Sequence, residues 1–316
     1  MSADHRSTAY AMVVTAALCF TVNAGVSRVV LRAGVDPATL TTLRVTGAVL
    51  VLGLWAALLR PQALRPPRAR QLWLVAAMGV VGVAGLQWTY FVAIDRLPVG
   101  LALLLEHTAP VLVALYVRVV RREAVRSRAW AALGLALLGL AGVAQVWQGF
   151  ELDGLGVLAG FGAAVCFATY FLLGESGVSD EDPLAVVLWS FVVAAVAMNV
   201  VSPLTALDTD LLTAETTLLG ALSGFSAPVW ALLVWVISLG TVVPFALELF
   251  ALQTLPATAV VVVAMLEPVG VTLLGWAWFG EALTPVQQLG ATAVIIGIVL
   301  AQTARRLPVA PPPPLG

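Results

Sequence analysis

The sequence has 316 residues, of which 61% are hydrophobic and only 10% are charged, whereas about 25% of the residues of soluble proteins are charged. The formal net charge of −1 and the absence of lysine leave no basic surface for a nucleic acid. The two cysteines and two histidines supply no disulfide framework and no metal site. The composition therefore predicts an all-α integral membrane protein without a metal or another cofactor.

Ten apolar segments follow one another along the chain, and most of them reach the roughly 20 residues that a membrane-spanning helix needs. They cover residues 8–31, 37–59, 71–94, 98–117, 129–147, 155–174, 184–206, 228–252, 256–279 and 285–303. The longest connections are 60–70 and 207–227, and a short surface helix is expected in the second. The first segment lacks a signal-peptide cleavage pattern and is interpreted as a retained helix.

The arginines are concentrated in alternate connections. Of the 16 basic residues, 12 fall on one predicted side, namely Arg6, Arg60, Arg65, Arg68, Arg70, Arg118, Arg121, Arg122, Arg126, Arg128, Arg305 and Arg306. Positively charged connections stay in the cytoplasm. Both termini are therefore predicted to be cytoplasmic, in a multi-pass protein of the plasma membrane, and the proline-rich residues 304–316 are expected to form an extended or disordered tail there.

The two halves of the chain are similar to each other. Residues 93–98 align with 251–256 at an offset of 158, and the same offset pairs Pro110 with Pro268. Earlier in the chain, Cys19-Phe20 aligns with Cys166-Phe167 at an offset of 147, and Asp36-Pro37 with Asp182-Pro183 at 146. Each half holds five segments, and an odd number forces the two copies into opposite orientations. The alignment predicts two inverted five-helix repeats, 8–147 and 155–303, as in secondary transporters.

Short motifs in both halves carry a family resemblance. The second half contains Leu266-Glu267-Pro268, Gly280-Glu281, Gln288-Leu-Gly290 and Gly297-Ile298. These motifs resemble the EamA-type family of the drug/metabolite transporter superfamily. The resemblance covers nearly the whole chain as two EamA units, and it implies export or exchange of small metabolites by alternating access.

The first half repeats the pattern less completely. Pro110, Glu123 and Gly139 match their counterparts, but Arg122 precedes Glu123 where the second half has glycine. Arg44 also matches an arginine that is common in the family. The stretch Leu105-Glu-His-Thr-Ala-Pro110 is similar to that of amino-acid exporters of the threonine/homoserine type, which is a weaker indication of substrate.

Ionisable residues within membrane segments are candidates for a substrate or proton pathway. Glu106 and His107 lie in the fourth segment and Glu267 in the ninth, where both carboxylates are expected on similar faces of matching helices. Each could contact substrate or exchange protons, or could only form a hydrogen bond between helices. Glu267 could equally satisfy the backbone that Pro268 interrupts.

Further candidates lie at matching depths. Glu248 in the eighth segment aligns with Tyr90 in the third. Arg44 needs an anionic partner, either an acid such as Glu106 or Glu267 or the carboxylate of a substrate. An aromatic and amide lining is expected from Asn23, Gln87, Trp88, Tyr90, Tyr170 and Trp189. Glu123 and Glu281 lie at segment ends, where they are expected to cap helices or pack loops.

Pro110 and Pro268 are expected to break their helices, because proline removes one backbone hydrogen bond and clashes with the carbonyl four residues earlier. The breaks could be working hinges or static kinks. The sequence predicts a secondary transporter of a small metabolite, an amino acid or related compound, with export as the favoured direction. A channel or a structural membrane protein is the alternative. An enzyme is not predicted, because ligands for metal chemistry are lacking, and neither is a homodimer. The predicted partners are a small-molecule substrate and the lipid bilayer.

Overall fold

The computed structural model describes residues 3–97, 99–147, 153–178, 182–206, 209–280 and 282–303. In the first half the helices are α1 (Ala3–Arg32), α2 (Pro37–Leu59), α3 (Ala69–Ala77), α4 (Leu86–Arg96), α5 (Val99–Glu106), α6 (Ala109–Val119) and α7 (Ser127–Ala144). In the second half they are α8 (Gly154–Val178), α9 (Pro183–Val201), α10 (Thr209–Thr213), α11 (Val229–Ile237), α12 (Val243–Leu252), α13 (Ala257–Ala264), α14 (Leu266–Phe279) and α15 (Pro285–Thr303).

The described part of the chain contains nine helical stretches long and apolar enough to cross a membrane. They correspond to the first nine predicted segments, so an all-α membrane protein is confirmed in outline. The tenth segment forms α15, whose apolar part, Pro285–Ala301, is shorter than the other nine. The tenth span therefore stays a prediction, and α15 has 19 residues in all, the same length as α9.

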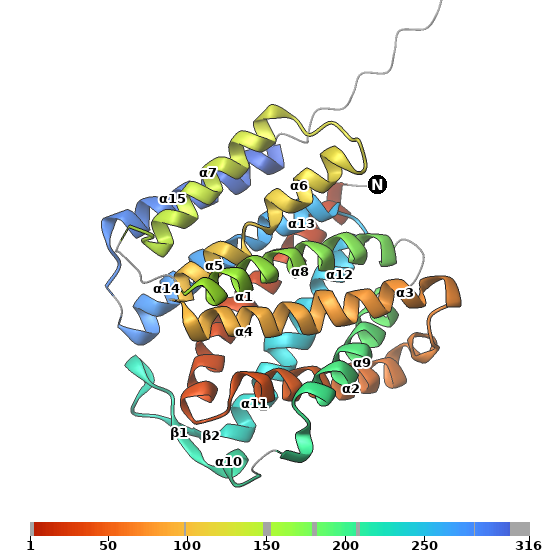
Figure 1. The fold of residues 1–316 in the computed structure, drawn as a ribbon, viewed down its shortest axis with the longest axis vertical. Coiled ribbons are helices and arrows are strands. Elements are labelled where there is room, and N and C mark those ends of the chain that lie inside the picture. The colour runs from red at the N-terminus through yellow and green to blue at the C-terminus, as the bar shows by residue number, and fades with distance from the viewer. Residues whose placement is uncertain are drawn as a thin grey trace, which may run out of the picture.

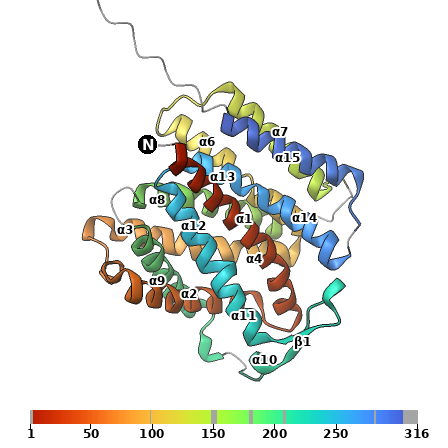
Figure 2. The same cartoon turned by 180° about the vertical axis from the view of Figure 1, so that it is seen from behind.

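The long connection between α9 and α11 holds more than the expected surface helix. Besides α10 it contains strands β1 (Glu215–Thr217) and β2 (Ser226–Pro228). The strands pair antiparallel, with Thr216 opposite Ala227. Figure 2 shows this hairpin beyond the ends of α1 and α14, away from the N-terminus. The indole of Trp278 in α14 donates a hydrogen bond of 2.9 Å to the carbonyl of Leu218 beside β1. We call this the hairpin end of the molecule, and the other the N-terminal end.

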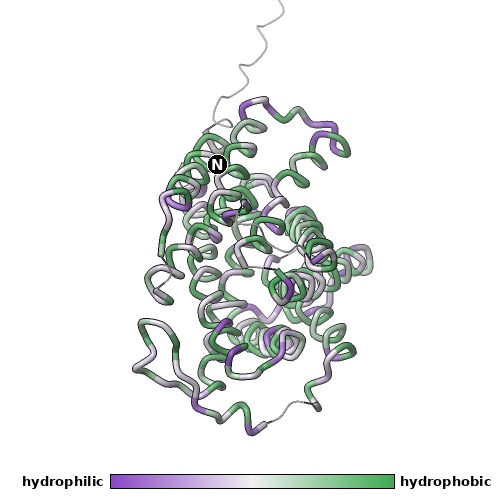
Figure 3. Tube along the Cα trace, turned by 60° about the vertical axis from the view of Figure 1, so that its left-hand side comes forward, coloured by the Kyte–Doolittle hydropathy of each residue, from purple (hydrophilic) through white to green (hydrophobic). Residues whose placement is uncertain are grey.

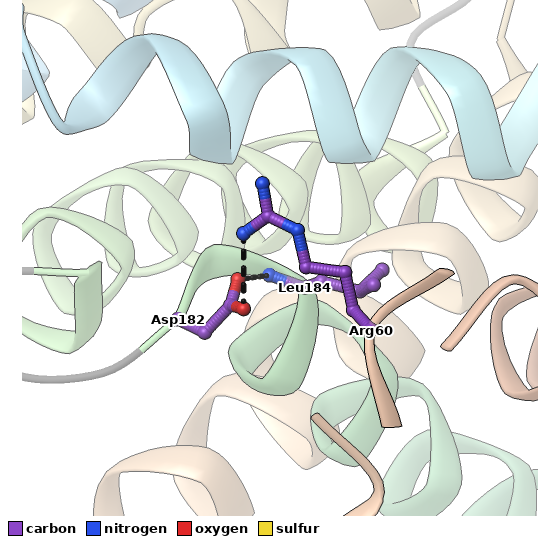
Figure 4. Close-up of polar contacts among 3 residues, drawn as sticks. All are labelled: Arg60, Asp182 and Leu184. Carbon is purple, nitrogen blue, oxygen red and sulfur yellow. Dashed lines mark hydrogen bonds and ion pairs between the residues drawn. The ribbon is translucent and has the colours of Figure 1, made fainter. Parts of the chain in front are cut away.

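Two matching aspartates start matching helices. Asp36 accepts hydrogen bonds from the backbone amides of Ala38 and Thr39 and caps α2. Asp182 accepts one from the amide of Leu184, at 3.0 Å, and caps α9. A proline follows each aspartate at the first helical position, where its missing N–H costs no hydrogen bond. Figure 4 shows that Asp182 also pairs with Arg60, at 3.2 Å, which joins the end of α2 to the start of α9.

Two further pairs of matching helices are interrupted at matching places. A π-helical segment, Met78–Gly85, joins α3 to α4, and another, Ser238–Val242, joins α11 to α12. The chain also breaks between α5 and α6, and again between α13 and α14, at positions that the offset of 158 relates. Pro110 lies in the first turn of α6 and Pro268 in the first turn of α14. Proline tolerates a first turn because the amide there has no intrahelical partner.

The contacts between helices also recur in matching form. Helix α1 packs on α12, and its counterpart α8 packs on α4; α2 packs on α9. Helices α7 and α15 lie side by side along one edge of the molecule (Figure 1). Gly139 and Gly290 permit that approach, since a side chain at Gly139 would meet the Gly290 carbonyl oxygen at 2.6 Å.

The distribution of polarity suits a lipid environment. Figure 3 shows hydrophobic residues over most helices and hydrophilic ones concentrated in connections. Leu50, Leu138 and Val200 are between 70% and 81% exposed on the outer surface, which water would disfavour and hydrocarbon accepts. Polar groups are buried instead, among them Arg44, Glu106, His107 and Glu248. The ionisable groups are therefore concentrated in the interior of the helix bundle.

Candidate substrate cavity

A cavity of about 870 Å³ leads from the hairpin end into the middle of the helix bundle. At its mouth lie exposed residues of the α1–α2 connection, including Arg32 and Asp36, together with Gln287 near the start of α15. Its inner part is lined by polar side chains from four helices, namely Asn23 of α1, Arg44 of α2, Tyr90 of α4 and Glu267 of α14. The cavity therefore connects one surface of the molecule to ionisable groups in its centre.

At the N-terminal end of the bundle, charged contacts join neighbouring helices. Arg121, which follows α6, forms an ion pair of 2.6 Å with Glu175 near the end of α8. The second carboxylate oxygen of Glu175 accepts a hydrogen bond of 3.0 Å from the backbone amide of Ala257, the first residue of α13. Three helices are thus joined at this end.

Arg44 is anchored to the second half of the chain. Its Nε donates to the hydroxyl of Thr241 at 3.0 Å, and its Nη2 donates to the carbonyl of Gly240 at 3.2 Å. Both partners belong to the π-helical segment before α12. The guanidinium also lies 5.9 Å from the ring centre of Phe91, a distance compatible with a cation–π contact.

The ion pair considered for Arg44 is not formed. Among the described residues, no carboxylate oxygen lies within 4 Å of its guanidinium, although its charge and that of Glu267 interact at longer range. The reason is that Thr241 and Gly240 hold the guanidinium in place. Glu267 lies in the first turn of α14, on a different helix from Arg44. Its backbone carbonyl accepts a hydrogen bond of 3.5 Å from the hydroxyl of Thr21.

Other predicted site residues lie beside the cavity and do not line it. Glu106, His107, Glu248 and Tyr170 are at most 9% exposed and form a buried polar region. The carboxyl group of Glu106 is close enough to those of Glu267 and Glu248 to interact with them electrostatically, so the region borders the inner part of the cavity. The hydroxyl of Tyr170 donates to the carbonyl of Phe245 at 3.1 Å.

His107 lies at the break between α5 and α6 and faces the break between α13 and α14. Its Nδ1 lies 3.0 Å from the carbonyl of Leu103. The ring also interacts with the carbonyl of Ala264, which is the one that Pro268 deprives of its usual partner. The Nε2 atom does not meet hydrogen-bond geometry with any described residue, so the contact with Ala264 is loose.

The predicted lining needs correction at four positions. Trp88 is 44% exposed, and it lies two positions from Tyr90, about 200° around the helix, so both cannot face the cavity. Trp189 donates from its indole to the carbonyl of Arg65 at 3.0 Å, outside the cavity. Gln87 is buried away from it, and neither its amide nitrogen nor its amide oxygen has a partner in the described part of the chain. Tyr170, as noted above, is also buried beside the cavity.

The two glutamates at segment ends are simpler to place. Glu123 is exposed in the loop after α6, and Glu281 lies outside the described residues.

Sequence reasoning missed two residues, Glu175 and Thr241. Glu175 was not singled out, although the offset of 147 aligns it with Arg28 and the offset of 158 aligns Arg121 with Phe279. Those two counterparts also touch, because the guanidinium of Arg28 lies 4.5 Å from the ring centre of Phe279. Thr241 carried no comparable signal, since its role depends on a π-helical segment that a single sequence does not reveal.

A bundle of apolar helices around a cavity that leads from one end of the molecule to buried ionisable side chains is the arrangement of a membrane transport protein. The EamA-like transporter family matches the chain twice, over residues 7–145 and 154–303. The chain belongs to this family and contains two EamA units, so the predicted family and the prediction of a membrane transporter are confirmed.

Named relatives and a solved structure are similar to the chain. The threonine/homoserine exporter RhtA of Escherichia coli K12 is 28% identical over 256 residues, which cover 81% of this chain and 78% of the relative. The uncharacterized transporter YwfM of Bacillus subtilis is 25% identical over 236 residues, covering 74% and 75% of the two chains. A solved crystal structure superposes with a TM-score of 0.76 at 20% identity over 95% of this chain and 98% of the other, which supports the fold.

Proposed function

We propose that this transporter is a secondary transporter of the plasma membrane that exports a small metabolite by alternating access. The observation that carries the proposal is the cavity of about 870 Å³, which reaches Arg44 and Glu267 from the hairpin end, while the Arg121–Glu175 ion pair joins helices at the N-terminal end. A channel would need a path open at both ends. The asymmetry favours a transporter in one of its two alternating states.

We also propose that the fold consists of two inverted five-helix repeats, with α15 as the tenth span. Matching interruptions support it, since α5 (99–106) and α13 (257–264) correspond residue for residue at the offset of 158. Reciprocal packing supports it as well, because α1 on α12 and α8 on α4 exchange under the same relation. In inverted-repeat transporters the substrate binds between the repeats, which is where the cavity ends.

The orientation follows from charge. The N-terminal end carries Arg60, Arg65, Arg118, Arg121 and Arg126, and the positive-inside rule assigns such an end to the cytoplasm. The cavity then opens outward, and both termini and the tail 304–316 lie in the cytoplasm. The direction of export, and an amino acid as substrate, are suggested by the relative named a threonine/homoserine exporter.

The test is transport in liposomes that contain the purified protein. Threonine and homoserine, labelled with tritium, should exchange across the membrane faster than in protein-free liposomes, and excess unlabelled substrate should saturate the rate. A Trp88→Phe variant is the matched control, because it changes an aromatic residue outside the cavity and should transport normally. If neither these nor other small metabolites exchanged above the protein-free rate, or if the flux did not saturate, alternating access would be wrong for this chain.

A further inference from the structure

Two opposite charges line the cavity without pairing with each other. Arg44 is only 6% exposed, and the guanidinium has five N–H donors, of which Nε and Nη2 have acceptors. The remaining nitrogen, Nη1, makes no hydrogen bond with the described residues. The carboxylate of Glu267 likewise has none there. A charge left in a low-dielectric interior without a partner is costly, so this arrangement suits a site whose partner arrives from outside.

The protein holds the two charges apart. Arg44 is held by hydrogen bonds to Thr241 and Gly240 of the second half. Position 240 must be glycine-sized, because any side chain there would overlap the amide of Asn23. Glu267 is fixed at the break before α14, where Thr21 contacts its backbone carbonyl. Because each is held by a separate helix, the gap between them is built before any ligand binds, which reduces the entropy cost of binding.

We propose that Arg44 and Glu267 form a two-point recognition site for a dipolar small molecule that carries one carboxylate and one ammonium group. The planar guanidinium donates two parallel hydrogen bonds to a carboxylate, which an ammonium group of lysine could not do. The carboxylate of Glu267 accepts from the ammonium group. The proposal rests on the proposed function in one respect, that this cavity is the one that takes the substrate.

The surroundings define the rest of the ligand. Arg44 and Glu267 together are neutral, so a ligand of zero net charge leaves no excess charge in the membrane interior. Most of the remaining inner wall is apolar, including Phe20, Phe91 and Leu103. The ligand's third group is therefore uncharged, and dianions such as phosphate esters are excluded.

The test is a binding cycle on the purified full chain in detergent, with two matched sets of probes. One set is leucine, leucinol and 4-methylpentanoate, and the other is threonine, threoninol and 3-hydroxybutyrate. In each set the second compound lacks the carboxylate and the third lacks the ammonium group. Isothermal titration calorimetry should show that each amino acid binds at least about tenfold more tightly than either analogue, because each analogue leaves one buried charge unpaired.

Two variants assign the groups. Arg44→Gln should abolish the preference for leucine over leucinol and keep the preference over 4-methylpentanoate, and Glu267→Gln should do the reverse. Arg44→Lys keeps the positive charge but loses the two-bond geometry, and should lose most of the carboxylate preference while remaining folded, as checked by size-exclusion chromatography. Glu123→Gln, in an exposed loop, should leave all six affinities unchanged.

The outcomes separate this proposal from the proposed function. Equal affinity of the analogues and the amino acids, no binding of either amino acid, or an equal loss of all ligands in both variants would overturn the dipolar site. Saturable transport of a compound with only one charge would overturn it too, yet would leave the transport function standing. Tight, charge-selective binding without any transport in liposomes would contradict the transport function and leave the recognition site supported.

Discussion

Breaking the ion pair between Arg121 and Glu175 should shift the transporter toward the state that is open at the N-terminal end. The pair joins the loop after α6 to α8, and Glu175 also accepts a hydrogen bond from the start of α13. Opening this end would separate the three elements. At the matching positions of the open end, the guanidinium of Arg28 lies 4.5 Å from the ring centre of Phe279.

The magnitude follows from the exposure of the pair. The side chains of Arg121 and Glu175 are 29% and 20% exposed, so solvent screens their attraction and the pair contributes about 1 kcal/mol, the upper end for exposed pairs. A change of about 1 kcal/mol alters the ratio of the two states about fivefold. Glu175→Gln removes the charge and keeps an oxygen for the amide of Ala257. The population open at the N-terminal end should therefore rise about fivefold while the fold is retained.

The assay uses a cysteine inside the cavity. Val271 lines the cavity, and Val271→Cys, in a chain whose Cys19 and Cys166 are replaced by alanine, becomes reachable from the cytoplasmic side only in the state open there. An impermeant thiol reagent added to inside-out vesicles should label this cysteine about fivefold faster in the Glu175→Gln background. Labelling from the opposite side should change little, since the state that is open at the hairpin end already predominates.

Controls define what would refute this reasoning. Arg118→Gln removes a nearby positive charge that has no ion pair in the described chain, and should leave the labelling rate unchanged. The double variant Arg121→Glu with Glu175→Arg should restore much of the slow rate. The effect should be the same from pH 6 to 9, because burial lowers the pKa of Arg121 but Glu175 more than offsets this and holds that pKa above its usual value. An unchanged rate in Glu175→Gln would show that the pair does not hold this end closed.

Three further predictions are independent of the ion pair. Single cysteines at Ala124 and Thr209 should be labelled from opposite sides of the membrane, and labelling of both from one side would contradict the proposed topology. Glu106→Gln should lower transport or alter its pH dependence with normal membrane insertion, whereas unchanged rates across pH would leave Glu106 a packing residue. Pro110→Ala and Pro268→Ala should keep the fold but slow transport while binding persists, and wild-type rates in both would make the breaks static kinks.

Much of the framework could be predicted because it depends on local chemistry. Apolar length located the spans, and the Asp-Pro pairs at 36–37 and 182–183 marked helix starts through capping that needs only neighbouring residues. The proline positions likewise indicated where α5–α6 and α13–α14 are interrupted. These features are set within a few residues of the chain, so one sequence suffices to recognise them.

The site could be predicted only in part, because its geometry depends on distant segments. Arg44 was expected to need an anionic partner, but its anchors, Thr241 and Gly240, lie in a π-helical segment almost 200 residues away. Trp88 was expected in the lining on residue type alone, and the direction in which its helix faces excluded it. Glu267, Asn23 and Tyr90 do line the cavity, in agreement with the rule that polar groups at mid-span face either the bundle interior or a cavity.

The two halves match in backbone but not in chemistry, and that difference bears on what the transporter recognises. At the offsets that relate the halves, Arg44 corresponds to Ser190, Glu267 to Ala109 and Asn23 to Tyr170. A strictly repeated sequence would place two arginines and two such glutamates around the centre, and four buried charges would need a larger, symmetric ligand. With one arginine and one such glutamate, the cavity holds a single pair of opposite charges with a fixed orientation. On the proposed alternating-access mechanism, the repeated backbone would supply the two alternating states, and the unrepeated side chains would supply one site that both states share.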